Sequence, residues 1–90
     1  MSDEDKLTIV GADWCGWTQK QVKEVASSKH AHMFEYIDCA GKDKDHELCK
    51  NVQGFPVIKN KDGHQCNVGF MDPKTDEFHE MMLKCQKGEK

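Results

Sequence analysis

Ala12-Asp13-Trp14-Cys15-Gly16-Trp17-Thr18 marks the point where the apolar run Leu7-Thr8-Ile9-Val10 gives way to a polar, helix-forming run. A cysteine at such a junction lies at the N-terminus of the helix. Unpaired backbone N–H groups and the positive end of the helix dipole stabilise a thiolate there. The thiolate is the nucleophile of thiol–disulfide exchange, so Cys15 is a candidate reactive sulfur. Thr18 stands three residues later, where a C-x-x-C pair has its second thiol.

Length and charge limit what the rest of the chain can be. Ninety residues predict one small domain, residues 1–90, which we expect to be a monomer. The net charge of -3 and the lack of Arg argue against a nucleic-acid partner. No apolar stretch is long enough for a membrane span, so we expect no membrane partner.

The first six residues are acidic and polar and carry no signal-peptide pattern. We therefore expect an intracellular, cytoplasmic protein. A secreted chain from which a signal peptide had been removed would look the same.

The five cysteines stand at positions 15, 39, 49, 66 and 85, so at least one is free or pairs outside the chain. None of their spacings matches a zinc site, and His64 with Cys66 is the one close His/Cys pair. We therefore expect no metal. Cys66 and Cys85 are expected to be packed apolar thiols, because free cysteine behaves as a small hydrophobe and Cys85 continues an apolar helical stripe.

Hydrophobic periodicity and turn signals predict alternating strands and helices. The expected strands are Lys6–Gly11, His32–Asp38, Val57–Asn60 and His64–Phe70; the expected helices run from Gly16 to Ser28, from an Asp45 cap to Asn51, and onward from an Asp72 cap with Pro73 as first residue. Lys61-Asp62-Gly63 predicts a hairpin turn. The order β-α-β-α-β-β-α predicts an α/β fold: a four-stranded mixed sheet with three flanking helices on both faces.

This order, with Trp14-Cys15-Gly16 at the first strand-to-helix turn and Gly54-Phe55-Pro56 before the hairpin, resembles the thioredoxin superfamily. The length is similar to its glutaredoxin-sized core. The resemblance implies a thioredoxin-like fold and a cis bond before Pro56, beside the active thiol. It also implies that backbone groups near Phe55 pair with an extended peptide or with glutathione.

The positions of Cys39 and Cys49 are similar to those in thioredoxin-like domains fused to vitamin K epoxide reductase homologues. Those domains carry one cysteine at the end of the second strand and another in the following short helix. A disulfide between Cys39 and Cys49 would close a short loop. Two buried thiols in a reducing cell are the alternative.

Cys15-Gly16-Trp17-Thr18 resembles the C-G-F-S motif of monothiol glutaredoxins. Relative to thioredoxins, Thr18 replaces the resolving cysteine and Ile9 replaces a buried acid. The resemblance implies a small monothiol thioredoxin/glutaredoxin-like protein. Cys15 would exchange disulfides with a protein or with glutathione, and an external thiol would resolve the mixed disulfide.

Two other functions stay open. One is a redox-silent module of the same fold that binds a partner peptide; the other is a monothiol-glutaredoxin-like carrier of glutathione or an iron–sulfur cluster. The expected catalytic residues are Cys15 and Thr18, and the expected substrate-binding residues are Trp14, Gly16, Trp17, Lys20, Phe55 and Pro56.

Two of these residues have alternative roles. The Thr18 hydroxyl could donate to the Cys15 sulfur, or Thr18 could be a helix-surface residue that caps backbone N–H groups. Lys20 could lower the pKa of the thiol or attract the carboxylates of glutathione.

Overall fold

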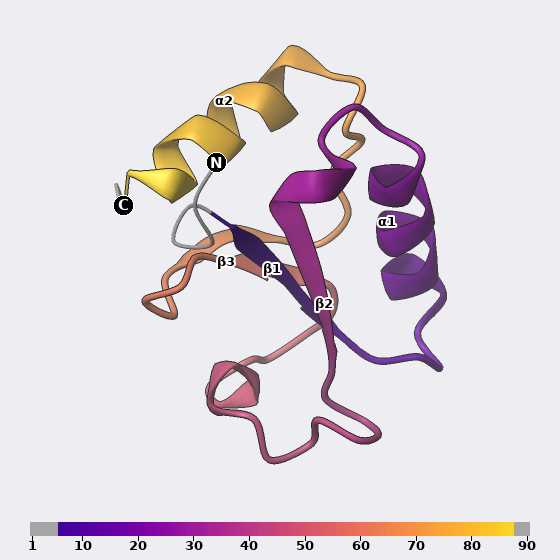
Figure 1. Ribbon diagram of the computed structural model, residues 1–90. Coiled ribbons are helices and arrows are strands. Elements are labelled where there is room, and N and C mark those ends of the chain that lie inside the picture. Colours follow the sequence, from indigo (N-terminus) through magenta and orange to yellow (C-terminus); the bar gives the residue numbers. More distant parts are fainter. Residues whose placement is uncertain (1–5, 88–90) are drawn as a thin grey trace.

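The computed structural model describes residues 6–87. It has four strands and two α-helices (Figure 1), which are β1 (Leu7–Gly11), α1 (Gly16–Ala26), β2 (Phe34–Asp38), β3 (Val57–Lys59), β4 (Gln65–Val68) and α2 (Asp76–Gln86). Short 3-10 turns, η2 (Ala31–Met33) and η3 (Glu47–Cys49), precede β2 and β3. No helix in this part of the chain is long and apolar enough to cross a membrane.

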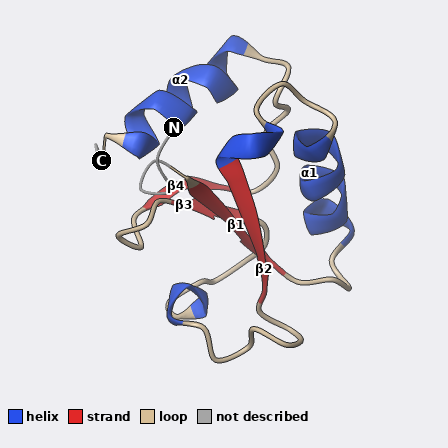
Figure 2. Cartoon of the chain, viewed as in Figure 1, coloured by secondary structure: helices blue, strands red, loops and turns tan. Residues whose placement is uncertain are grey.

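The strands form one mixed sheet in the order β2-β1-β3-β4 (Figure 2). β1 pairs parallel with β2 and antiparallel with β3, and β3 pairs antiparallel with β4. All five residues of the central strand β1 are buried, as its apolar, β-branched sequence predicts. The predicted α/β fold with a four-stranded mixed sheet is therefore confirmed.

The predicted helix from Asp45 to Asn51 is wrong, because only the 3-10 turn η3 forms there. Its N-cap is His46, whose Nδ1 accepts a hydrogen bond from the Leu48 backbone N–H at 3.0 Å. The backbone becomes extended at Lys50, and Asn51 has a φ of 64°, in the left-handed region. An α-helix cannot continue through these two residues, so α1 and α2 are the α-helices of the described chain.

Both α-helices pack on one face of the sheet, which corrects the expectation of helices on both faces. Val25 of α1 and Phe78 of α2 join a single core cluster with Leu7 and Ile9, alternate residues of β1. The opposite face meets the chain between β2 and β3, where the ammonium of Lys59 on β3 donates to one carbonyl within η3 and to one directly after it.

The start of the last helix also differs from its prediction. α2 begins at Asp76, and its N-cap is Thr75, whose hydroxyl oxygen accepts from the Phe78 backbone N–H at 3.2 Å. Asp72 instead opens a turn, because its backbone carbonyl accepts from the Thr75 backbone N–H at 3.1 Å. Thr75 followed by two acidic residues is itself a strong helix start, and it outcompetes the Asp72-Pro73 signal.

Four of the five cysteines form disulfides. The Cys39–Cys49 bond, left open by the sequence, is present with a Cα–Cα distance of 5.7 Å. Cys66 and Cys85 are also bonded, across a Cα–Cα distance of 5.6 Å, so the prediction of two packed free thiols is wrong. Cys85 is buried on the core face of α2 as expected, but this face brings it directly against β4.

Candidate functional site

The free thiol belongs to Cys15, which is the N-cap of α1 and is partly exposed. Its backbone N–H donates to the Ala12 carbonyl at 2.9 Å, and its carbonyl accepts from the Gln19 N–H at 3.0 Å. These two bonds hold the turn between β1 and α1. The sulfur is therefore placed where the first N–H groups of the helix lack partners within the helix.

The pKa of the Cys15 thiol is lowered mainly by hydrogen bonds from the Thr18 backbone N–H and the Thr18 hydroxyl. Partial burial acts in the opposite direction, and the Trp17 N–H adds a smaller lowering. Thr18 is 1% exposed, and its hydroxyl oxygen also accepts from the Ala12 N–H at 3.4 Å. The Thr18 hydroxyl therefore acts on the sulfur and on a backbone N–H at once, and its side chain is buried rather than on the helix surface.

The second side of the site is the turn before β3. The Phe55–Pro56 peptide bond is cis, as the family resemblance implies. The Cys15 sulfur lies 4.0 Å from the Phe55 carbonyl oxygen, so residues 40 positions apart meet at the thiol. Pro56 is buried, and its carbonyl accepts from the Gly69 N–H at 2.7 Å. Gly69 has a φ of 93°, which favours glycine at this junction.

Two aromatic pairs project beside the thiol. Trp14, which is 72% exposed, contacts Phe55 edge-on with a centroid distance of 6.1 Å. Trp17, which is 58% exposed, contacts Phe70 with a distance of 5.9 Å between the ring centroids. Exposed aromatic rings of this kind are typical of surfaces that bind other molecules. We call Trp14, Trp17, Phe55 and Phe70 the aromatic rim.

The Lys20 side chain contacts two rings of the aromatic rim. Its ammonium lies 5.5 Å from the ring centroid of Trp17 and 5.0 Å from that of Phe70. The pKa of Cys15 is lowered by Thr18 and Trp17 and not by Lys20, so of the two roles considered for Lys20 the attraction of carboxylates stays a prediction. Lys20 instead joins two rings by cation–π contacts and leaves a positive charge at the edge of the rim.

Gly16 keeps the start of the helix open. It is the first residue of α1, and a Cβ atom built on it meets nothing within 4 Å. The structure thus places Trp14, Cys15, Trp17 and Thr18 at the start of α1, with Phe55 and Pro56 on the other side of the thiol.

Gln21 and Phe70 were missed by sequence reasoning. Gln21 is fully buried in α1; its side-chain amide donates to the Met71 carbonyl at 3.0 Å and accepts from the Met71 N–H at 2.9 Å. This pair of bonds ties the segment carrying Phe70 to the helix carrying Cys15. The available signal was a polar residue on the buried stripe Thr18, Gln21 and Val25.

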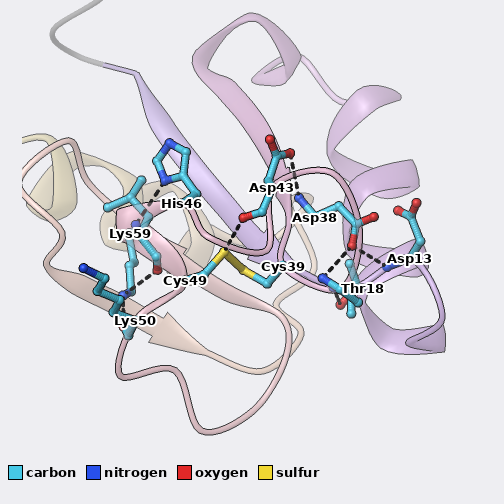
Figure 3. The surroundings of a disulfide bond; sticks show 12 residues. Asp13, Thr18, Asp38, Cys39, Asp43, His46, Cys49, Lys50 and Lys59 are labelled. Carbon is cyan, nitrogen blue, oxygen red and sulfur yellow. Dashed lines mark hydrogen bonds between the residues drawn. A yellow bond between two sulfur atoms is a disulfide. The ribbon is translucent and has the colours of Figure 1, made fainter.

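Asp38 was also missed, and it supports the loop before the thiol. Its carboxylate accepts from the backbone N–H groups of Asp13 at 3.2 Å and Ala40 at 3.0 Å. Burial alone would raise the pKa of Asp38, but these backbone hydrogen bonds bring the pKa below its usual value. The Tyr36 hydroxyl donates to the Asp13 carboxylate at 2.7 Å. Figure 3 shows Asp13, Thr18 and Asp38 together at this end of the sheet.

Among residues 6–87, no three His, Cys, Asp or Glu side chains are grouped so that they could hold a metal ion. Comparisons with models of protein families, with curated proteins and with solved structures found no match to this chain.

Proposed function

We propose that this chain is a monothiol, thioredoxin-like protein that exchanges disulfides through Cys15. The observation that carries the proposal is the state of Cys15: it is the one free cysteine, it begins a helix, and Thr18 lowers the pKa of its thiol. A thiol with a lowered pKa supplies more nucleophile near neutral pH. The β-α-β order at the start of the chain and the turn at Pro56 support the thioredoxin-like assignment.

The chemistry has two steps. The Cys15 thiolate attacks one sulfur of a disulfide R–S–S–R′, which forms a Cys15–S–S–R bond and releases R′–S⁻ to take up a proton. A second thiolate, R″–S⁻, then attacks the R sulfur of this mixed disulfide, which forms an R–S–S–R″ bond, breaks the Cys15–S–S–R bond and releases the Cys15 thiolate.

The resolving thiol must come from outside the chain. Thr18 carries a hydroxyl where a C-x-x-C protein has its second sulfur, and the other four cysteines are already paired. Glutathione or a second cysteine of the substrate has the required chemistry. The positive charge of Lys20 at the rim favours a ligand that carries a carboxylate.

The aromatic rim supports a second candidate, a redox-silent module that binds a partner peptide. The exposure of Trp14 and Trp17 favours binding whether or not the sulfur reacts. The two functions differ in what they require of Cys15. Exchange needs the thiolate, whereas peptide binding alone survives its replacement by serine.

A test of the proposal is reduction of a mixed disulfide between glutathione and a cysteine-containing peptide, with free glutathione as the resolving thiol. The wild-type protein is expected to accelerate the reaction and Cys15→Ser to abolish the acceleration. A glutathione adduct on Cys15, seen by mass spectrometry when free glutathione is omitted, would identify the intermediate. If wild type and Cys15→Ser are equally inactive while both bind the peptide, the redox-silent module is correct.

The disulfides bear on the compartment that we propose. The sequence led us to expect a cytoplasmic protein, but cytosolic thiols are normally kept reduced. Two disulfides in one small domain favour an oxidising compartment instead. Fractionation of the cell of origin, followed by alkylation without reductant, distinguishes the cytosol from an oxidising compartment. If the alkylating reagent modifies Cys39, Cys49, Cys66 and Cys85, these thiols are free and the cytosolic assignment is correct.

A further inference from the structure

Lys59 is a buried cation on the face of the sheet away from the α-helices. It is 4% exposed and lies on β3, opposite Thr8 of β1. Its ammonium donates to the Leu48 carbonyl at 2.9 Å and to the Lys50 carbonyl at 3.2 Å. These two residues flank Cys49, which is bonded to Cys39, and Figure 3 shows Lys50 and Lys59 on one side of this disulfide.

No carboxylate within the described residues forms an ion pair with Lys59. An ammonium has three donors, and the two carbonyls use two of them. A buried charge without a counter-ion is unfavourable, and burial accordingly lowers the pKa of Lys59. An anion next to this ammonium would supply both the missing charge and the missing acceptor.

Lys59 lines an open cleft of about 400 Å³ between η3 and the hairpin turn. Its charged lining comprises three lysines and two carboxylates, which are Lys50, Lys59, Lys61, Glu47 and Asp62. The lining therefore carries one net positive charge, although the whole chain is negative.

His46 adds a ring N–H donor to the same cleft. Its Nδ1 accepts from the Leu48 N–H, so this nitrogen carries no proton and Nε2 is left as the donor. Figure 3 shows His46, Lys50 and Lys59 on the side of the disulfide away from Thr18 and Asp13. None of the cleft residues belongs to the aromatic rim or to the thiol turn.

We propose that this cleft is a binding site for a small oxyanion, a phosphate or a carboxylate group, with the Lys59 ammonium as its central donor. Lys50 and the His46 ring provide further donors around it. The site is separate from Cys15, so it stands whether or not the chain exchanges disulfides.

The test is a titration of the full chain with inorganic phosphate and, in a parallel arm, with acetate, at constant ionic strength. NMR detection of the Lys59 Cε–Hε resonances reports on the ammonium directly. We expect saturable binding of at least one anion at millimolar concentration. Saturation by phosphate alone assigns the site to phosphate groups, and saturation by acetate alone assigns it to carboxylates.

Three variants make the test specific. Lys59→Met keeps the length of the buried side chain and is expected to weaken binding by about tenfold or more, because a charge-assisted hydrogen bond is lost. Lys50→Met removes an exposed charge and leaves the Lys50 carbonyl in place, so a smaller loss is expected without a risk to folding. Lys84→Met removes the same charge at an exposed position of α2, outside the cleft, and this variant should bind the anion as the wild type does.

Two results would overturn the proposal. One is the absence of saturable binding by both anions. The other is equal weakening in Lys50→Met and Lys84→Met, which would mean that only net charge matters. If Lys59→Met does not fold, as judged by circular dichroism, the comparison of Lys50→Met with Lys84→Met decides alone.

Discussion

A Cβ atom on Gly11 would overlap the side chain of Thr18, so the end of β1 and the first turn of α1 meet with no space between them. Thr18 is held between this glycine and the Cys15 sulfur that it hydrogen-bonds. The packing at the end of β1 therefore sets the position of the hydroxyl that stabilises the thiolate.

We expect Gly11→Ala to destabilise the protein by about 1–3 kcal/mol, because the added methyl group must displace Thr18 or the strand. The displacement should also raise the pKa of Cys15. Urea denaturation and the pH dependence of alkylation measure the two effects. Gly16→Ala is the matched control: its methyl group meets open space, so stability should change by less than about 0.5 kcal/mol. Equal effects at both glycines would show that the contact with Thr18 is unimportant.

Alkylation of Cys15 by iodoacetamide should rise with a midpoint below that of an ordinary cysteine thiol, because the pKa of Cys15 is lowered. Thr18→Val removes the hydroxyl and keeps the shape, so the midpoint should move upward. Thr18→Ser keeps the hydroxyl and should stay close to wild type. A midpoint that is unchanged in Thr18→Val would assign the low pKa to the backbone N–H groups alone.

The same shift couples pH to stability. The folded protein binds its Cys15 proton more weakly than the unfolded chain does, so the free energy of unfolding should increase as pH rises from the lowered pKa to the unfolded value. This increment should be absent in Cys15→Ser. Urea midpoints measured across that pH interval check the sign, and a decrease that depends on Cys15 would contradict it.

Thr18→Cys should convert the site to a dithiol. The side chain at this position is buried and already within hydrogen-bonding reach of Cys15, so a sulfur there can form a disulfide with it. We expect this variant to reduce insulin. The wild type should do so poorly, because it has no second thiol at this position. A variant that stays inert while its Cys15 still reacts with iodoacetamide would show that the assumed geometry is wrong.

Removing the Cys66–Cys85 bond by the double substitution Cys66→Ser, Cys85→Ser should destabilise the protein by about 3 kcal/mol, from the loop entropy of its 19-residue separation. The 10-residue separation of Cys39–Cys49 predicts a slightly smaller loss for the corresponding pair of serines. Urea denaturation measures both. Cys15 alkylation should remain intact in each folded variant, since neither bond contacts its sulfur.

Local sequence patterns were sufficient for much of the fold. The β-branched run Leu7-Thr8-Ile9-Val10 predicts β1, and Lys61-Asp62-Gly63 predicts the turn in which Gly63 has a φ of 85°. Cys66 and Cys85 were beyond such patterns, because their pairing depends on how α2 crosses β4. The helix predicted from Asp45 to Asn51 was wrong although its signal is local. The left-handed backbone conformation of Asn51 prevents an α-helix from continuing there.

In the candidate site too, residues of one continuous segment could be predicted, whereas residues brought together by the fold could not. Cys15, Thr18 and Trp14 were identified from one continuous segment, and Phe55 followed from the family resemblance. Phe70 is absent from the expected set because it reaches Trp17 only through the fold, held by the Gln21 bonds to Met71. Residues whose roles depend on contacts between distant segments leave little trace in a single sequence.

The odd number of cysteines also affects how the chain folds and how it survives heating. In the native state, Cys15 lies next to Phe55 while the other four cysteines are bonded in pairs. Once the chain opens, its thiolate can attack either bridge and exchange partners, producing wrongly linked isomers. Thermal unfolding should therefore become irreversible at pH values where Cys15 is a thiolate. In the folded state, the two native disulfides are kept away from the Cys15 sulfur, although that sulfur is partly exposed to other molecules.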